Sequence, residues 1–226
     1  MRIFILTLSL LVSIPSFSQI DKSYYQHLEY RMIGPFRGGR TVGAVGVPSQ
    51  PNVFFIGVNN GGVWKTDDYG RTWNPIFDDV ATGSVGDLAV SPSHPNVIYV
   101  GTGEGLHRPD LAVGDGMFKS NDGGESWEHM GLDDIQQISR VIVHPRNPDL
   151  VYVAGLGHPY GANEMRGIFK STDGGKTWKK TLFINQNTGA IQVEMDPNNP
   201  NILFAAMWEH QEGPWENAKF SGPHSG

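Results

Sequence analysis

Short apolar runs with alternating polar positions recur along the chain, and each ends in a turn rich in proline, glycine, asparagine or aspartate. The pattern is clearest in four successive runs, at residues 138–144, 150–155, 166–171 and 177–183. Valine, isoleucine, phenylalanine and tyrosine suit half-buried strands, and no stretch shows the periodicity of an amphipathic helix. We therefore predict an all-β fold in which these runs are short strands joined by tight turns.

A unit of about 50 residues repeats along the chain. Three segments share the pattern Ser/Thr-x-Asp-x-Gly-x-Ser/Thr-Trp, and their tryptophans are 54 and 51 residues apart: Thr66–Trp73, Ser120–Trp127 and Ser171–Trp178. Proline-bounded turns recur in step with them, at 48–52, 92–96, 145–149 and 197–201. Four short strands per repeat of this length are typical of a β-propeller blade.

The repeat positions predict how much of a propeller is present. We expect blades at about 40–80, 84–131 and 137–184, and an incomplete blade at 188–226. The fourth repeat reaches residue 226 without its Ser/Thr-x-Asp-x-Gly pattern. Because propellers usually have roughly 4–8 blades, we interpret the chain as about three and a half blades, truncated on the C-terminal side.

The most repetitive residues are expected to be structural. Asp68, Asp122 and Asp173 can accept backbone N–H groups within their own turns. Trp73, Trp127 and Trp178 offer large apolar faces for packing between blades. The alternative is calcium binding, but the ligand spacing and the final glutamate of an EF-hand loop are missing. We predict no metal and no cofactor.

The N-terminus has the layout of a secretory signal. Arg2 precedes an apolar run at 3–14, and small residues, Ser16 and Ser18, precede a potential cleavage site before Gln19. The apolar run is shorter than the ~20 residues that a membrane-spanning helix needs. The alternative is a buried N-terminal strand or helix. We predict a signal peptide at 1–18 and a mature protein that is secreted, periplasmic or on the outer surface of a bacterial cell, with no membrane span.

Composition removes several classes of function. Zero cysteines among 226 residues exclude disulfides and thiolate nucleophiles. The formal net charge of −6 argues against nucleic acid as a partner, because phosphate binding requires clustered lysine and arginine.

Strand order predicts where a ligand would bind. The turns between first and second strands and between third and fourth strands share one end of the blades, and the remaining loops share the other end. The second-to-third loops are long, at about 101–116, 154–167 and from 208 onward. Function concentrates on such loops. Their ligand-face candidates are Glu104, His107, Arg108, Asp115, His158, Tyr160, Arg166, Trp208 and Glu209.

This mixture of carboxylate, guanidinium, imidazole and aromatic groups suits a sugar or a peptide. The shorter fourth-to-first loops add Asp78, Asp79, Asp133 and Asp134. Glycoside hydrolysis normally uses two carboxylates, which Glu104, Asp115, Glu164, Glu209 and Glu216 could supply. The alternative for any one of these residues is a solvated loop side chain or a member of a salt bridge within its loop.

The repeated Asp-x-Gly pattern resembles the Asp-box, or bacterial neuraminidase repeat. With the stretches Arg31–Arg40, Gly155–Gly161 and Met195–Asn201, it makes the chain from about residue 28 similar to exported bacterial proteins with a sortilin-type N-terminal propeller. Members of this group are often labelled glycosyl hydrolases, and sortilin-type receptors bind peptides. The resemblance implies downstream blades of the same parent protein.

The resemblance also allows a check on catalysis. Xyloglucan-degrading relatives have a catalytic aspartate just before a Gly-Gly pair, where this chain has Asn59. An amide cannot act as a general base or nucleophile. No arginine lies in a sialidase-like context. We therefore predict a non-catalytic segment that binds a peptide or glycan, with a glycoside hydrolase or a purely structural module as alternatives.

Overall fold

Twelve of the fourteen strands in the described part of the chain form three four-stranded antiparallel sheets, as the repeat predicts. The computed structural model describes residues 21–28, 39–105, 111–213, 219 and 221–226. The chain divides into two compact units, residues 1–36 and 37–226. The first contains the short 3-10 helix η1 (Lys22–Tyr24), and the predicted signal peptide lies outside the described residues.

Each sheet is formed by consecutive strands. The first is β1 (Arg40–Val47), β2 (Gln50–Asn59), β3 (Gly62–Thr66) and β4 (Asn74–Pro75), and the second is β5 (Val85–Val90), β6 (Ile98–Thr102), β7 (Met117–Ser120) and β8 (Glu128–His129). After η2 (Asp133–Ile135), the third is β9 (Ile138–His144), β10 (Asn147–Gly155), β11 (Gly167–Ser171) and β12 (Lys179–Leu182). The fourth has β13 (Thr188–Met195) and β14 (Leu203–Glu209). We call these sheets blades 1 to 4.

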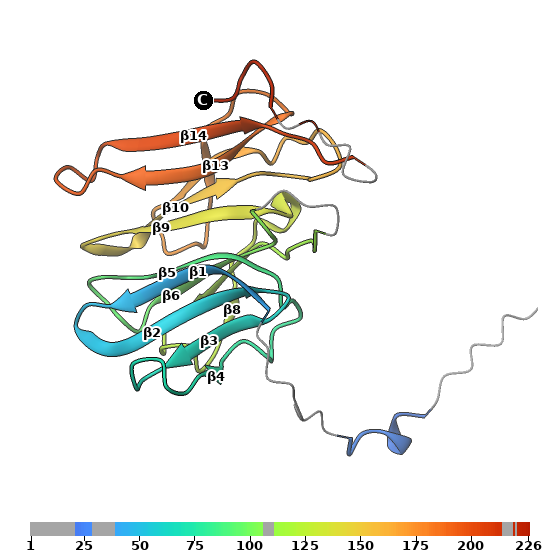
Figure 1. The fold of residues 1–226 in the computed structure, drawn as a ribbon, viewed down its shortest axis with the longest axis vertical. Coiled ribbons are helices and arrows are strands. Elements are labelled where there is room, and N and C mark those ends of the chain that lie inside the picture. Colours follow the sequence, from blue (N-terminus) through green and yellow to red (C-terminus); the bar gives the residue numbers. More distant parts are fainter. Residues whose placement is uncertain (1–20, 29–38, 106–110, 214–218, 220) are drawn as a thin grey trace, which may run out of the picture. The chain divides into compact units, whose positions relative to one another are not determined.

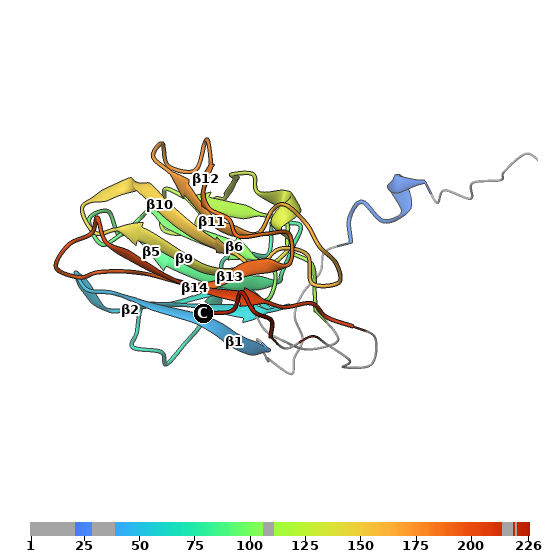
Figure 2. The same ribbon diagram turned by 90° about the horizontal axis from the view of Figure 1, so that it is seen from above.

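The blades pack against one another in chain order. The first strands β1, β5, β9 and β13 contact each other in succession (Figure 1), and the view from above shows the sheets overlapping along this row (Figure 2). One apolar cluster lies at each of the three junctions, built around Phe55, Ile138 and Tyr152. The prediction of an all-β, blade-like fold is confirmed.

A bulge recurs in the first strand of every blade. The pairing register shifts between Thr41 and Gly43 in β1, and at the matching places in β5, β9 and β13. β-Bulges bend a strand and redirect its side chains. The residues that follow the bulge therefore occupy equivalent places in the four blades: Gly43, Asp87, Arg140 and Gln192.

Three of the blades are tied together at this level by charged groups. Arg140 lies 3.6 Å from the carboxylate of Asp87 in the preceding blade and 3.1 Å from Glu194 in the next one. Asp87 also accepts the backbone N–H of Val141 at 2.8 Å. Burial raises the pKa of Asp87 to about 6, although this hydrogen bond and Arg140 oppose the shift.

The three Asp-boxes are closed by the same hydrogen bonds. In the second box, Asp122 accepts the Ser120 hydroxyl at 2.7 Å, the Ser126 N–H at 2.9 Å and the Ser126 hydroxyl at 2.5 Å. Asp68 and Asp173 accept the equivalent bonds. The hydrogen bonds from Thr72 and Thr177 lower the pKa of Asp68 and Asp173 to about 2. Each box therefore stabilises its own turn.

The Asp-box tryptophans connect neighbouring blades. Trp127 donates its indole N–H to the carbonyl of Ile76 at 2.6 Å, and Trp178 donates to that of Met130 at 2.8 Å. Both acceptors lie just after the fourth strand of the preceding blade. Trp73 lies over Gly70 of its own box. The repeat thus encodes a turn and a contact between blades.

Candidate functional site: the loop end of the blades

The loops between second and third strands differ from blade to blade. In blade 1 the connection is the tight turn at Asn60, which has a positive φ of 55°. In blades 2 and 3 it spans residues 103–116 and 156–166, and in blade 4 it follows Glu209. The fourth-to-first connections, which include Asp133 and Asp134, end beside them. These segments form what we call the loop end. The Asp-boxes and proline turns form the opposite, turn end.

Glu104 joins several segments of the loop end and is fully buried. Its carboxylate accepts the Asn59 amide at 3.1 Å, the Ala112 N–H at 3.2 Å and, at the limit of hydrogen-bond distance, the Asn60 amide at 3.5 Å. Its own backbone N–H is bonded to the Gln137 side-chain carbonyl. Buried carboxylates are costly unless they are hydrogen-bonded, so this network shapes the loop from within.

Arg166 is a second buried support. Its guanidinium donates to the carbonyls of His158 at 2.6 Å and Gly161 at 3.0 Å, within its own loop. It also donates to His210 O at 3.2 Å, just after β14, and to Asn187 O at 3.4 Å, just before β13. Burial lowers the pKa of Arg166 to about 10, so the group remains charged at neutral pH. The planar donor fork fixes the two loops relative to each other.

Glu209 has a comparable role in the last described segment. It is buried and bonded to the Lys219 ammonium, and it accepts the His224 imidazole at 2.9 Å. The hydrogen bond from Lys219, followed by that from His224, lowers the pKa of Glu209 to about 2. Glu104, Arg166 and Glu209 therefore build the loop end from inside.

Other candidates are exposed or half-buried at the junction of blades 3 and 4. Tyr160 is 52% exposed, and His158 is paired with Asp134 at 2.8 Å. Trp208 stacks on His210 with 4.0 Å between the ring centroids. The Glu212 N–H donates to Pro159 O at 2.7 Å, which holds the two loops together. We call Tyr160, His158, Asp134 and Trp208 the aromatic–acid patch.

A histidine–carboxylate cluster lies at the loop end of blade 2. The side-chain ligand atoms of Asp115, His129 and Asp133 lie within 4.8 Å of one another. His129 Nε2 is 2.9 Å from Asp133 Oδ1 and 2.9 Å from the Asp115 carbonyl. These side chains could coordinate a divalent metal, but the distances are those of direct hydrogen bonds to His129.

Some predicted residues and some unpredicted ones remain to be placed. His107 and Arg108 lie outside the described residues. The sequence did not indicate the roles of Gln137, Asn60 and Asp87, which make contacts across blades. The bulge lies at the same position in the first strand of every blade, and this could have indicated a role for Asp87. The position can be recognised only after the strands of the four blades are aligned.

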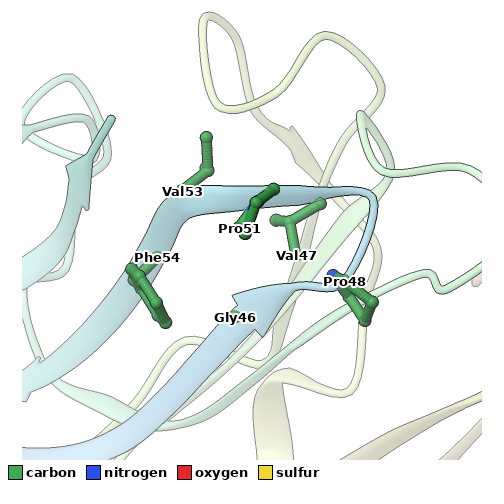
Figure 3. Close-up of a pocket in the computed structure, with 6 residues that line it drawn as sticks. All are labelled: Gly46, Val47, Pro48, Pro51, Val53 and Phe54. Carbon is green, nitrogen blue, oxygen red and sulfur yellow. The ribbon is translucent and has the colours of Figure 1, made fainter. Parts of the chain in front are cut away.

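A pocket of about 310 Å³ lies at the turn end of blade 1. Its lining comes from the β1–β2 hairpin, and Figure 3 shows Phe54, Val53 and the two prolines around it. The lining side chains are apolar, and ligand sites normally add a few polar groups that fix orientation.

Among the described residues, no helix is both long and apolar enough to cross a membrane.

Family comparison agrees with this architecture. The family model described as "Sortilin, neurotensin receptor 3" matches residues 61–217. The chain belongs to the Sortilin-Vps10 family. The matched region of this Sortilin-Vps10 chain runs from the β2–β3 turn to beyond β14, so it includes both ends of blades 2 and 3.

The relatives of this Sortilin-Vps10 chain include xyloglucanases. A probable oligoxyloglucan-reducing end-specific xyloglucanase of Neosartorya fischeri is 29% identical over 102 residues, covering 43% of this chain and 11% of the relative. A xyloglucanase of Acetivibrio thermocellus is 26% identical over 174 residues, covering 70% and 20%. The chain thus spans no more than about a fifth of the length of these relatives.

Solved structures show the same fold. An ancestral GH74 enzyme matches 77% of this chain and 22% of its own length, with a TM-score of 0.60 and 23% identity. The GH74 enzyme of Niastella koreensis matches 77% of this chain and 27% of its own, with a TM-score of 0.52 and 22% identity. The Sortilin-Vps10 chain is therefore a propeller segment related in fold to the GH74 enzymes.

Proposed function

We propose that the chain is an exported propeller segment that binds a glycan at its loop end and does not hydrolyse it. A peptide is the alternative ligand. The proposal rests on what each end of the blades offers. The turn end is occupied by Asp-boxes whose carboxylates are satisfied within their own turns. The loop end carries exposed aromatic and acidic side chains over a rigid support.

The absence of hydrolysis is argued from Asn59. This residue stands where the resemblance to xyloglucan-degrading enzymes places a catalytic aspartate. Its side chain is buried and donates to Glu104, so it acts as a hydrogen-bond donor to a carboxylate. An amide with this role cannot take a proton from water or attack a sugar carbon. This single observation most strongly supports binding without turnover.

The aromatic–acid patch favours a glycan. Tyr160 presents an exposed ring that can stack on the apolar face of a pyranose, and Asp134 and His158 can exchange hydrogen bonds with sugar hydroxyls. The patch combines residues from two blades on a base fixed by Arg166. Such an arrangement can bind a ligand without any mobile catalytic group.

The second candidate is a glycoside hydrolase. The xyloglucanases among the relatives favour it. In that case one carboxylate would come from this loop end and the other from blades beyond the chain. Glu104 is the best-placed carboxylate near Asn59, at 3.1 Å from its amide nitrogen.

One experiment separates the two candidates. Calorimetry measures the binding of xyloglucan oligosaccharides to the purified chain and to any longer polypeptide that contains it. The same mixtures are assayed for new reducing ends. We expect saturable binding and no release of reducing ends. Release that is lost in Glu104→Gln would establish the hydrolase instead. Binding of a peptide library without any glycan binding would replace the proposed ligand.

Export is a separate part of the proposal. It is supported by the charged, apolar and small-residue layout of residues 1–18. N-terminal sequencing of protein recovered from the periplasm or medium should begin at Gln19. Recovery of a cytoplasmic chain that begins at Met1 would contradict export.

A further inference from the structure

Three side chains that can bind a metal ion converge at the loop end of blade 2. Within the described residues, Asp115, His129 and Asp133 form the one group of three or more such side chains whose ligand atoms lie within 4.8 Å of one another. His129 Nε2 is 2.9 Å from Asp133 Oδ1 and 2.9 Å from the Asp115 carbonyl oxygen. One imidazole nitrogen therefore faces oxygen atoms from two other segments of the chain.

The neighbouring histidine–aspartate pair shows what a simple hydrogen-bonded pair looks like in this fold. His158 Nε2 is 2.8 Å from Asp134 Oδ1 and 3.1 Å from the carbonyl oxygen of the same residue. In the part of the chain that the structure describes, no third ligand side chain joins this pair in a cluster. Asp115 makes the difference, because it adds a second carboxylate to the pair of His129 and Asp133.

The backbone fixes the segments that carry the two carboxylates. The Asp115 N–H donates to the hydroxyl of the buried Thr102 at 2.6 Å. A Cβ atom on Gly116, which has a positive φ of 71°, would overlap with the Gly131 carbonyl and approach the Asp133 nitrogen. The two segments are therefore in direct contact at a glycine, and their carboxylates are held close together.

The His129 ring is oriented by its neighbour across the β7–β8 pair. It packs edge-on against the buried Phe118, with 5.0 Å between the ring centroids. The side chains of His129 and Asp133 are 39% and 62% exposed, so an ion can reach them from solution. The cluster is thus ordered on its protein side and open on its solvent side.

The chemistry of the ligands favours zinc over calcium or magnesium. Imidazole nitrogen is a common ligand of zinc and other transition ions, whereas calcium and magnesium prefer oxygen ligands. Two aspartates with a neutral histidine balance the charge of a divalent cation. Zinc bonds of about 2.0–2.2 Å in a tetrahedron put neighbouring ligand atoms about 3.3 Å apart, so the contacts of 2.9 Å need to widen by only about 0.4 Å.

We propose that Asp115, His129 and Asp133 bind one zinc ion at the loop end of blade 2. The ion takes the place of the proton that His129 Nε2 shares with the surrounding oxygens, and the neutral ring carries its proton on Nδ1. The Asp115 carbonyl is the nearest group that can supply a fourth ligand. The sequence-based prediction of no metal did not include this site, because separations of 14 and 4 residues match no metal motif that we recognised.

Zinc at this place fastens η2 to blade 2. The helix is flanked by two non-glycine residues with a positive φ, Leu132 at 66° and Gln136 at 63°. Such conformations are costly and persist only where the surrounding structure holds them. Because Asp133 is the first residue of η2, its bond to zinc adds to the contacts that hold the connection between blades 2 and 3. The inference does not depend on the proposed function.

Calorimetric titration of the untagged chain with zinc chloride tests the site. Three single variants each remove one ligand with little change in size: Asp115→Asn, His129→Gln and Asp133→Asn. The matched controls, Asp134→Asn and His158→Gln, make the same changes in the neighbouring pair. We expect a single saturable site of micromolar affinity in the original chain and in both controls. We expect at least about 10-fold weaker zinc binding in each ligand variant.

Cobalt provides a second readout that reports the coordination of the ion. Four-coordinate Co²⁺ absorbs visible light much more strongly than the hydrated six-coordinate ion. We expect this absorption when cobalt is added to the original chain and to His158→Gln, and its absence with His129→Gln. Circular dichroism and the melting temperature without metal show whether each variant is folded.

Three results would overturn the proposal. The first is the lack of saturable zinc binding to the original chain at micromolar zinc. The second is equal zinc affinity in the original chain and in His129→Gln. The third is tighter binding of calcium than of zinc, which would contradict a histidine ligand. Oligosaccharide titrations with and without zinc test the proposed function separately.

Discussion

The two ends of the blades follow opposite rules. At the turn end, three boxes repeat one set of hydrogen bonds, with residues such as Asp122 satisfied by groups no more than four positions away. At the loop end, Glu104 and Arg166 are bonded to groups as far as 45 and 44 positions away. No two loops are alike. The repeated segments therefore determine the blade architecture, and the loops that interrupt the repeat hold the contacts that are specific to this protein.

The contact between blades at the turn end should be the most sensitive to mutation. Trp127 packs edge-on against Phe77, with 5.0 Å between ring centroids, and donates to Ile76 O. We expect Trp127→Ala to lower the free energy of unfolding by about 4 kcal/mol, through the lost area and the cavity. Urea unfolding measures this. Trp127→Phe, which keeps a ring but loses the hydrogen bond, should lose less; an equal loss would point to the hydrogen bond alone.

The buried guanidinium at the loop end should be next. Replacing Arg166 by Met leaves buried carbonyls of His158 and His210 without their donor. We expect a loss of about 3 kcal/mol of unfolding free energy, because hydrogen bonds to charged groups are the strong ones. Arg166→Lys should recover only part of it, since lysine lacks the fork. A stability unchanged in Arg166→Met would show that the loops need no internal support.

The pH dependence of folding stability should differ between Asp87 and the Asp-box residues Asp68 and Asp173. Burial raises the folded-state pKa of Asp87 from 3.8 to about 6, so folding favours its neutral form. Its contribution therefore weakens as pH rises from about 4 to 6, by about 3 kcal/mol at one pKa unit per 1.4 kcal/mol. Asp68 and Asp173, with pKa lowered to about 2, contribute stability above pH 4 that is lost as pH falls towards 2.

The Asp87 contribution can be isolated by substitution. Asp87→Asn cannot ionise, so its unfolding free energy should lack the fall between pH 4 and 6 that the original chain shows. Denaturant titrations at a series of pH values compare the two proteins. Parallel curves in this range would mean that Asp87 titrates with an ordinary pKa.

The smallest effect on stability, and the largest on binding, is expected at the aromatic–acid patch. Tyr160→Ala removes an exposed ring and should change the unfolding free energy by less than about 0.5 kcal/mol. It should weaken oligosaccharide binding about 10-fold, which corresponds to about 1.4 kcal/mol. Lys176→Ala, at an exposed position of the third Asp-box, is the matched control from the turn end. Equal affinities of both variants would remove Tyr160 from the site.

Whether a feature of this fold can be predicted from the sequence depends on how far apart in the chain its interacting residues lie. The strands of blade 3 and the roles of Asp68, Asp122 and Asp173 depend on alternation and on partners a few residues away, so they can be predicted from a single sequence. Whether Glu104 or Arg166 faces a ligand depends on loops that meet only after the blades pack. Their residue types suit a binding surface, yet both are buried supports.

The claim that the ligand binds at the loop end, and that the turn end is structural, is tested most directly by hydrogen exchange with and without xyloglucan oligosaccharides. The account predicts ligand-dependent protection at residues 156–166 and 207–212, and none at 66–73, 120–127 and 171–178. Protection at the Asp-boxes would place the ligand at the wrong end of the blades and contradict the account. The absence of protection throughout the chain at saturating oligosaccharide would contradict glycan binding.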